Sequence, residues 1–133
     1  MNDQGPLSIL YVDDDKDIRH IVKIALSLDP QLDLRLAGSG DEALALLADG
    51  TWRPDVVLLD VMMPGMNGPA VMRTMREDHG LRDAPFIFIT AMGRENDVAS
   101  YRQLGAGIIL KPFDPINLAQ RIRAIVASLG QAG

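Results

Sequence analysis

The sequence predicts an α/β fold in which a parallel, doubly wound sheet of five strands has helices on both faces. Short apolar runs rich in branched residues alternate with stretches whose apolar residues recur at the period of a helix, as in strand-helix units along a parallel sheet. Five such units fit within the 133 residues, a length that suits one compact core. We therefore expect one domain over residues 1–133, with its core at about 7–129.

The first two strand-helix units are predicted from residues 7–50. The first strand is expected at Leu7–Val12 and the second at Leu32–Ala37, where apolar and polar residues alternate. Ser39 and Glu42, three positions apart, predict a capping box that opens the second helix, and Gly50 is expected to end it. The predicted apolar face of the first helix consists of Ile18, Ile21, Val22, Ala25 and Leu28.

The middle of the chain predicts a strand that is buried on both faces. Residues Asp55–Asp60 read DVVLLD, and their unbroken apolar middle is typical of a central strand in a parallel sheet. A third helix is expected to run through His79 and stop at Gly80. The fourth strand is expected at Pro85–Thr90.

The last two helices differ in their predicted exposure. Residues Arg94–Leu104 contain few apolar side chains, so we expect that helix to be largely exposed. A short fifth strand at Gly107–Leu110 follows, and Asp114 with Pro115 predicts the start of the final helix. The apolar stripe of that helix consists of Leu118, Ile122, Ile125, Val126 and Leu129.

Polar residues of several types stand at the carboxyl ends of the predicted strands. In an open parallel sheet these ends form one edge, where binding sites occur. Each residue alone has an ordinary explanation as a turn, strand or surface residue, but their convergence at one edge favours a site. The residues concerned are Asp13, Asp14, Asp15, Asp60, Thr90, Lys111 and Pro112.

The residue types at this edge favour phosphoryl chemistry assisted by a divalent cation. Carboxylates without cysteine or nearby histidine suit Mg²⁺, Mn²⁺ or Ca²⁺ rather than zinc. Asp60, at a strand end beside a dication, could attack phosphorus. Lys111 would offer a compact positive charge and Thr90 a hydroxyl donor to the transferred group.

The composition narrows the class of partner. Apolar residues make up 47% and charged residues 23%, as in an ordinary globular protein. The formal net charge of −5 opposes nucleic acid and anionic membrane surfaces, so we expect neither as a direct partner. The absence of cysteine excludes disulfides and thiolate sites. No signal peptide or membrane-spanning run is apparent, and a cytoplasmic location is expected.

Four motifs in order, YVDDD, VVLLDVMMPGMNG, FIFITA and LKPF, carry a family resemblance. With them, nearly the whole chain resembles the CheY-like receiver domain of two-component response regulators. The resemblance implies a flavodoxin-like sheet with strand order 2-1-3-4-5. It also implies a phosphoprotein switch that catalyses only its own phosphorylation and slow autodephosphorylation, rather than an enzyme.

The resemblance assigns a role to each edge residue. It implies Asp60 as the phospho-acceptor and Thr90 with Lys111 as its catalytic partners, with a cis peptide bond between Lys111 and Pro112. It implies Mg²⁺ or Mn²⁺ held by Asp60 and three further residues, namely Asp14 directly, Asp13 through water, and Met62 through its backbone carbonyl. The phosphoryl donor would be a sensor histidine kinase or a histidine phosphotransfer protein. Because no output domain is apparent, the signal is expected to pass to another protein.

One position departs from the family pattern. Receivers commonly carry an aromatic switch residue three positions before the lysine, where this chain has Ile108, and the segment LGAGIILKPF is one residue shorter than usual. The departure concerns how the signal leaves the site and does not touch the phosphorylation chemistry.

Three other functions stay open at this point. A haloacid-dehalogenase-type phosphatase also uses a strand-end aspartate, magnesium, threonine and lysine, but it needs a second aspartate where this chain has Met62, which cannot act in acid-base catalysis. An interaction module that is never phosphorylated is disfavoured by the intact acid, hydroxyl and lysine set. A flavin-binding protein rests on fold analogy alone.

Overall fold

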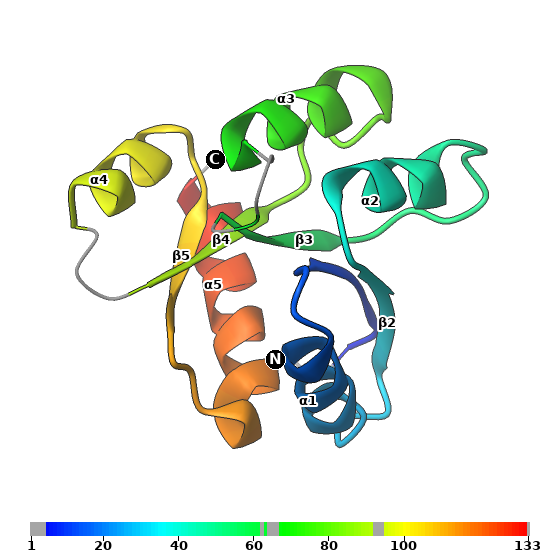
Figure 1. Ribbon diagram of the computed structural model, residues 1–133, viewed down its shortest axis with the longest axis vertical. Helices are drawn as coiled ribbons and strands as arrows, with labels where there is room; N and C mark the ends of the chain where they lie inside the picture. The colour runs from blue at the N-terminus through cyan, green and yellow to red at the C-terminus, as the bar shows by residue number, and fades with distance from the viewer. Residues whose placement is uncertain (1–4, 62, 64–66, 92–94, 133) are drawn as a thin grey trace.

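The computed structural model describes residues 5–61, 63, 67–91 and 95–132. Within them, five parallel strands form a sheet in the order β2-β1-β3-β4-β5 (Figure 1), which confirms the α/β class and the implied strand order. Two strands have the predicted bounds, β3 and β5 differ from theirs by one residue at one end, and β4 differs by one residue at each end. The strands are β1 (Leu7–Val12), β2 (Leu32–Ala37), β3 (Val56–Asp60), β4 (Phe86–Ala91) and β5 (Gly107–Lys111).

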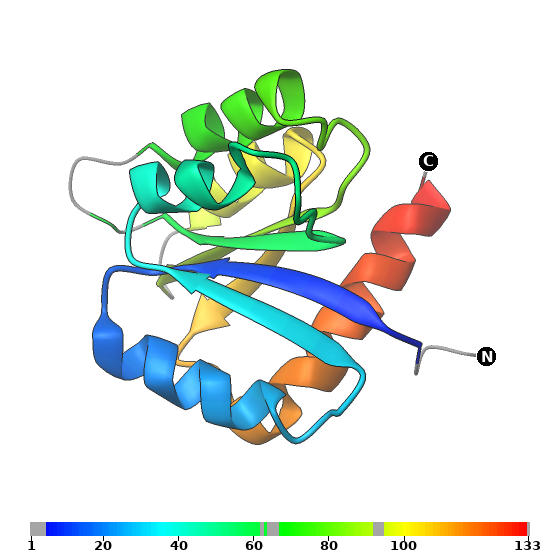
Figure 2. The same ribbon diagram turned by 90° about the vertical axis from the view of Figure 1, so that its right-hand side faces the viewer.

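The helices cover the sheet from both sides. Figure 2 shows α1 and α5 on one face and α2, α3 and α4 on the other. A short 3-10 turn, η1 (Pro115–Asn117), leads into the last helix, which begins at Leu118 instead of Pro115. The helices are α1 (Lys16–Leu26), α2 (Gly40–Leu47), α3 (Gly68–Asp78), α4 (Glu95–Gln103) and α5 (Leu118–Ala132).

The sheet separates two hydrophobic cores, and alternation along the strands decides which residue enters which core. In β3, Val57 and Leu59 pack in the core beneath α2, α3 and α4. Val56 and Leu58 pack on the opposite side, against α1 and α5. All residues of β3 are buried, as predicted for a central strand. Burial on both faces makes β3 a rigid support for Asp60 at its end.

The first helix buries a narrower stripe than its sequence predicts. Val22, Ala25 and Leu26 are buried, but Ile21 is 42% exposed and Leu28 is 70% exposed, so the prediction that these two lie on the buried face was wrong. Leu28 lies beyond the last residue of α1. Ile21 is exposed because the elements that lie closest to α1, namely β2, η1 and α5, leave the flank of its apolar face uncovered.

The predicted helix ends are partly confirmed. The Ser39 hydroxyl accepts a hydrogen bond from the Glu42 N–H at 3.0 Å, as in a capping box, but the Glu42 carboxylate accepts from Gly38 instead of Ser39. Helix α2 ends at Leu47, before Gly50. Helix α3 ends at Asp78, one residue before the predicted His79, and the predicted stop Gly80 has φ of 72°, a left-handed conformation that favours glycine.

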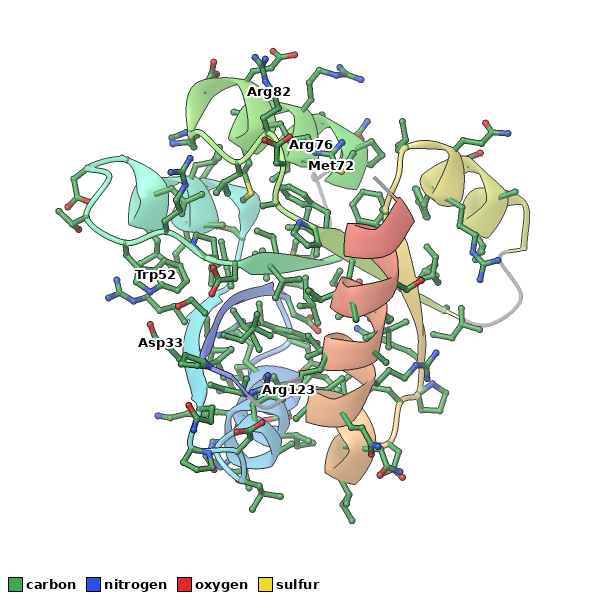
Figure 3. The ribbon with its side chains drawn as sticks, turned by 180° about the vertical axis from the view of Figure 1, so that it is seen from behind. Asp33, Trp52, Met72, Arg76, Arg82 and Arg123 are labelled. Carbon is green, nitrogen blue, oxygen red and sulfur yellow. The ribbon has the colours of Figure 1, made fainter. Side chains whose placement is uncertain are left out.

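Polar contacts also join elements at places remote from the carboxyl edge, the sheet edge formed by the carboxyl ends of the strands. The residues Arg123, Trp52 and Asp33 of these contacts are labelled in Figure 3. Arg123 on α5 donates from Nε to Asp29 Oδ2 at 3.1 Å, tying α5 to the turn after α1. Trp52 donates from Nε1 to Asp33 Oδ2 at 2.9 Å, and the Arg35 guanidinium lies 4.6 Å from the Trp52 ring centre. The two Trp52 contacts cover part of the edge strand β2. Among the described residues, no helix combines the length and apolar character needed to cross a membrane.

Candidate functional site

The pleat of the sheet brings three polar side chains to one side of the carboxyl edge. Asp13 directly follows β1, Asp60 ends β3 and Lys111 ends β5. Each stands two residues after a side chain that faces the α1 and α5 core: Tyr11, Leu58 and Ile109 respectively. Because side chains alternate along a strand, Asp13, Asp60 and Lys111 point to this same side.

Three carboxylates gather at this edge. Asp13, Asp14 and Asp60 each offer an oxygen, and these oxygens lie within 4.8 Å of one another. Asp13 is wholly buried and Asp60 is 2% exposed, whereas Asp14 is exposed. Asp15 is not part of this cluster, because its side chain caps α1 by accepting from the N–H groups of Asp17 and Ile18. The run of three aspartates therefore divides between the cluster and a helix cap.

Lys111 connects two of the carboxylates. Its Nζ donates to Asp60 Oδ2 at 2.6 Å and lies 3.3 Å from Asp13 Oδ2. The Lys111–Pro112 peptide bond is cis, as the resemblance implied. One ammonium group thus contacts two buried carboxylates.

Burial, hydrogen bonds and neighbouring charges together shift the pKa values of Asp13 and Lys111. Burial raises the pKa of Asp13, the N–H of Asp15 lowers it, and the neighbouring Asp60 charge raises it, with a net rise above the ordinary value. Burial lowers the pKa of Lys111, but its hydrogen bond to Asp60 and the charges of both carboxylates raise it above its ordinary value overall. The edge thus favours a protonated lysine and disfavours a further negative charge.

Thr90 lies at the same edge and carries a buried hydroxyl group. It is wholly buried in β4, on the opposite side of the pleat from Ile89. Within the described part of the chain, no hydrogen-bond partner is present for its Oγ1. A buried polar atom without a partner costs about 1–3 kcal/mol. This hydroxyl is therefore available as a donor to a group that enters the edge.

The donor set fits a hard divalent cation. Carboxylate oxygens from three residues are the ligands that Mg²⁺ and Mn²⁺ prefer, and their mutual repulsion would be relieved by a dication. The backbone carbonyl predicted as a further ligand belongs to Met62, which lies outside the described residues. The structure thus brings Asp13, Asp14, Asp60 and Lys111 together and places Thr90 at the same edge, whereas Asp15 caps α1.

One residue of this network was missed in the sequence. The Tyr11 hydroxyl donates to Asp13 Oδ2 at 3.0 Å. Burial raises the pKa of Tyr11 far above its ordinary value, and the Asp13 charge raises it further, so the hydroxyl keeps its proton and acts as a donor. The available signal was a tyrosine within an apolar strand, two positions before an aspartate and therefore on the same side of the pleat.

Comparisons with known proteins agree with this architecture. A family model, the response regulator receiver domain, matches residues 9–123. The transcriptional regulatory protein CpxR of Klebsiella pneumoniae is 40% identical over 89% of this chain and 48% of its own length. The DNA-binding response regulator MtrA of Mycobacterium tuberculosis is 40% identical over 87% of this chain and 49% of its own. The chain therefore spans about half the length of these curated relatives.

Solved structures show the same likeness. The chemotaxis response regulator CheY4 of Vibrio cholerae superposes with a TM-score of 0.77 at 29% identity, over 91% of this chain and 99% of that chain. A CheY-like receiver domain protein of Methanospirillum hungatei gives a TM-score of 0.72 at 30% identity, over 96% and 98% of the two chains. In both, the likeness extends over nearly the whole of either chain.

Proposed function

This chain belongs to the response regulator receiver family of two-component systems, and we propose that Asp60 is the residue on which it accepts a phosphoryl group. The observation that carries the proposal is the hydrogen bond of 2.6 Å between Lys111 and Asp60. This bond places the Lys111 ammonium beside the Asp60 carboxylate, at the edge where the Asp13 and Asp14 carboxylates also lie. The donor we propose is a phosphohistidine on a sensor kinase or phosphotransfer protein in the cytoplasm.

The transfer is a displacement at phosphorus. A carboxylate oxygen of Asp60 forms the new P–O bond while the P–N bond to the donor histidine breaks, and the electron pair of that bond stays on the histidine nitrogen. Lys111 then turns its ammonium from Asp60 toward the phosphoryl oxygens, which carry the greater negative charge. The Thr90 hydroxyl, which has no hydrogen-bond partner among the described residues, donates to one of the same oxygens.

Asp60, Asp14 and Asp13 would hold a Mg²⁺ or Mn²⁺ ion, with Asp13 acting through water and the Met62 carbonyl as a further ligand by family resemblance. When bound, the dication supplies positive charge that offsets the carboxylates and the arriving phosphoryl oxygens. Asp13 and Lys111 orient the Asp60 carboxylate, and burial keeps bulk water from competing for its oxygens.

The direct test is phosphorylation of Asp60→Asn. Wild-type protein incubated with acetyl phosphate or a phosphorylated kinase should gain one phosphoryl group, only when Mg²⁺ is present, and should lose it in alkali because an acyl phosphate is base-labile. Asp60→Asn should gain none, since its amide is a poor nucleophile. Intact-mass spectrometry measures the modification.

Asp55→Asn is the matched control, because it makes the same chemical change at the opposite end of the third strand. Asp55 is exposed and accepts a hydrogen bond from the Ser8 N–H, which an asparagine oxygen can also accept. This variant should be phosphorylated like wild type. Equal phosphorylation of Asp60→Asn would overturn the assignment.

The output we propose is a change in contacts with another protein. Two of the relatives are named as DNA-binding or transcriptional regulators, but the net charge of −5 opposes direct nucleic-acid binding by this chain. A phosphatase function is less well supported, because Met62 stands where that chemistry needs an acid. Hydrolysis of p-nitrophenyl phosphate with turnover would favour the phosphatase.

A further inference from the structure

Tyr11 carries a hydroxyl group in the middle of an otherwise apolar core. Its side chain is wholly buried among the residues that face α1 and α5, next to Leu58 in the register of β1 with β3. A buried tyrosine hydroxyl usually needs a hydrogen-bond partner. Here the partner is Asp13 Oδ2, at 3.0 Å.

Asp13 is held by donors on both of its oxygens. Oδ1 accepts from the N–H of Asp15 at 3.0 Å, and Oδ2 accepts from Tyr11 at 3.0 Å and from Lys111 at 3.3 Å. The Lys111 contact is the longest of the three, and Lys111 also makes the shorter bond to Asp60. In the proposed phosphorylation Lys111 turns toward the phosphoryl group. Tyr11 would then be the side chain that still holds Oδ2.

The Tyr11 hydroxyl also differs from Lys111 in charge. A lysine beside a carboxylate lowers the attraction of that carboxylate for a dication, because the two positive charges repel each other. A neutral hydroxyl orients the carboxylate and favours its ionised form without this repulsion. Tyr11 therefore supports Asp13 without opposing the cation.

We propose that Tyr11 is a positioning residue that holds the Asp13 carboxylate toward the divalent cation and thereby sets the metal affinity of the site. This inference rests on the proposed function, in which Asp14 and Asp60 bind the ion directly and Asp13 binds it through water. Groups that hydrogen-bond to metal-binding side chains typically change metal affinity about 10–100-fold when they are removed.

The test is Tyr11→Phe, which removes only the hydroxyl. Free Mn²⁺, counted by electron paramagnetic resonance, gives the dissociation constant without any phosphorylation reaction. The expected result is about tenfold weaker Mn²⁺ binding. The Mg²⁺ concentration that gives half-maximal phosphorylation by acetyl phosphate should rise by a similar factor, while the rate at saturating Mg²⁺ stays near that of wild type.

Two further variants separate positioning from a structural role. Ile9→Val removes one methylene group from the same core, two residues earlier on the same side of β1, and should lower stability without changing Mn²⁺ affinity. In an Asp13→Ala background, Tyr11→Phe should have no further effect on Mn²⁺ binding, because the carboxylate that it positions is gone.

An unchanged Mn²⁺ dissociation constant in Tyr11→Phe would overturn the inference, as would an equal loss of affinity with and without Asp13. Either result can be told apart from failure of the proposed function. If wild-type protein accepted no phosphoryl group, the proposed function would be wrong. The Mn²⁺ dissociation constants of wild type and Tyr11→Phe would still show whether Tyr11 sets the metal affinity.

Discussion

At the scale of single residues, Asp13 shows how a buried carboxylate is kept in an acidic site. Burial and the charge of Asp60 disfavour its ionised form, whereas the Asp15 N–H and the Lys111 ammonium favour it. The net effect raises the pKa of Asp13, so the folded chain without metal binds a proton there more tightly than the unfolded chain does. This difference makes stability depend on pH.

The sign of that dependence follows from the raised pKa. Between the pKa of Asp13 in the unfolded chain and its higher pKa in the folded chain, the native state holds more protons than the unfolded state. The contribution of Asp13 to stability is therefore fully present below the unfolded-state pKa and is lost as pH rises through the folded-state pKa. In EDTA, Asp13→Asn should therefore gain stability relative to wild type as pH rises from about 4 to about 7. Urea unfolding of both proteins across this range measures the difference. A constant difference would contradict the raised pKa.

At the scale of elements, the corner between β4, β5 and α4 differs from the expected arrangement of receivers. Ile108 pairs with Phe88 in the strand register and is half-buried. The aromatic ring at this corner comes instead from the helix: Tyr101 packs edge-on against Phe88, with ring centres 4.7 Å apart and an angle of 72° between the rings. The described side chains of α4 are otherwise mostly exposed, as predicted, and Leu104 just beyond the helix is 41% exposed.

A double-mutant cycle tests whether this ring pair holds α4 to the sheet. Phe88→Leu and Tyr101→Leu should each destabilise the protein, and their coupling energy should be about 0.5–1.5 kcal/mol, because edge-to-face ring pairs contribute that much beyond area burial. Urea unfolding of the four proteins gives the coupling. Tyr101→Leu combined with Val22→Ala, on the other side of the sheet, should be additive, and a coupling near zero for the ring pair would refute the prediction.

At the scale of the whole molecule, the parallel sheet joins metal binding to folding. All five strands run in one direction, so the residues at the carboxyl ends of β1, β3 and β5 meet at one edge only in the folded chain. The unfolded chain does not hold Asp13, Asp14 and Asp60 together. A cation that binds this cluster therefore stabilises the native state by mass action.

We predict that Mg²⁺ at about 100 times its dissociation constant adds about 2.7 kcal/mol to the free energy of unfolding. Asp14→Ala should lose much of this gain, since fewer carboxylates leave less charge and fewer oxygens for the ion. Urea unfolding in MgCl₂ and in NaCl of equal ionic strength separates binding from screening. Asp55→Asn, at the opposite edge, should keep the full gain. If Asp14→Ala also kept it, Asp14 would not be a ligand.

The sequence by itself determined the order of the elements and the position of the site. Hydrophobic periodicity placed β1 and β2 at their observed bounds, and the strand ends indicated which polar residues share an edge. Strand order and individual residue roles came from the family resemblance instead, because periodicity records only local environment. These predictions succeeded because strand length and side-chain alternation are local properties of the backbone.

Only the tertiary structure decided how the parts meet. The apolar pattern of α1 could not show that its neighbours cover Val22 and leave Ile21 exposed, because coverage depends on helices distant in sequence. Nor could spacing show that Lys111 bonds to Asp60 and Asp13 together. The Tyr11 hydroxyl beneath Asp13 was likewise set by packing. Periodicity specifies which side of an element is apolar, but long-range packing specifies which atoms that side touches.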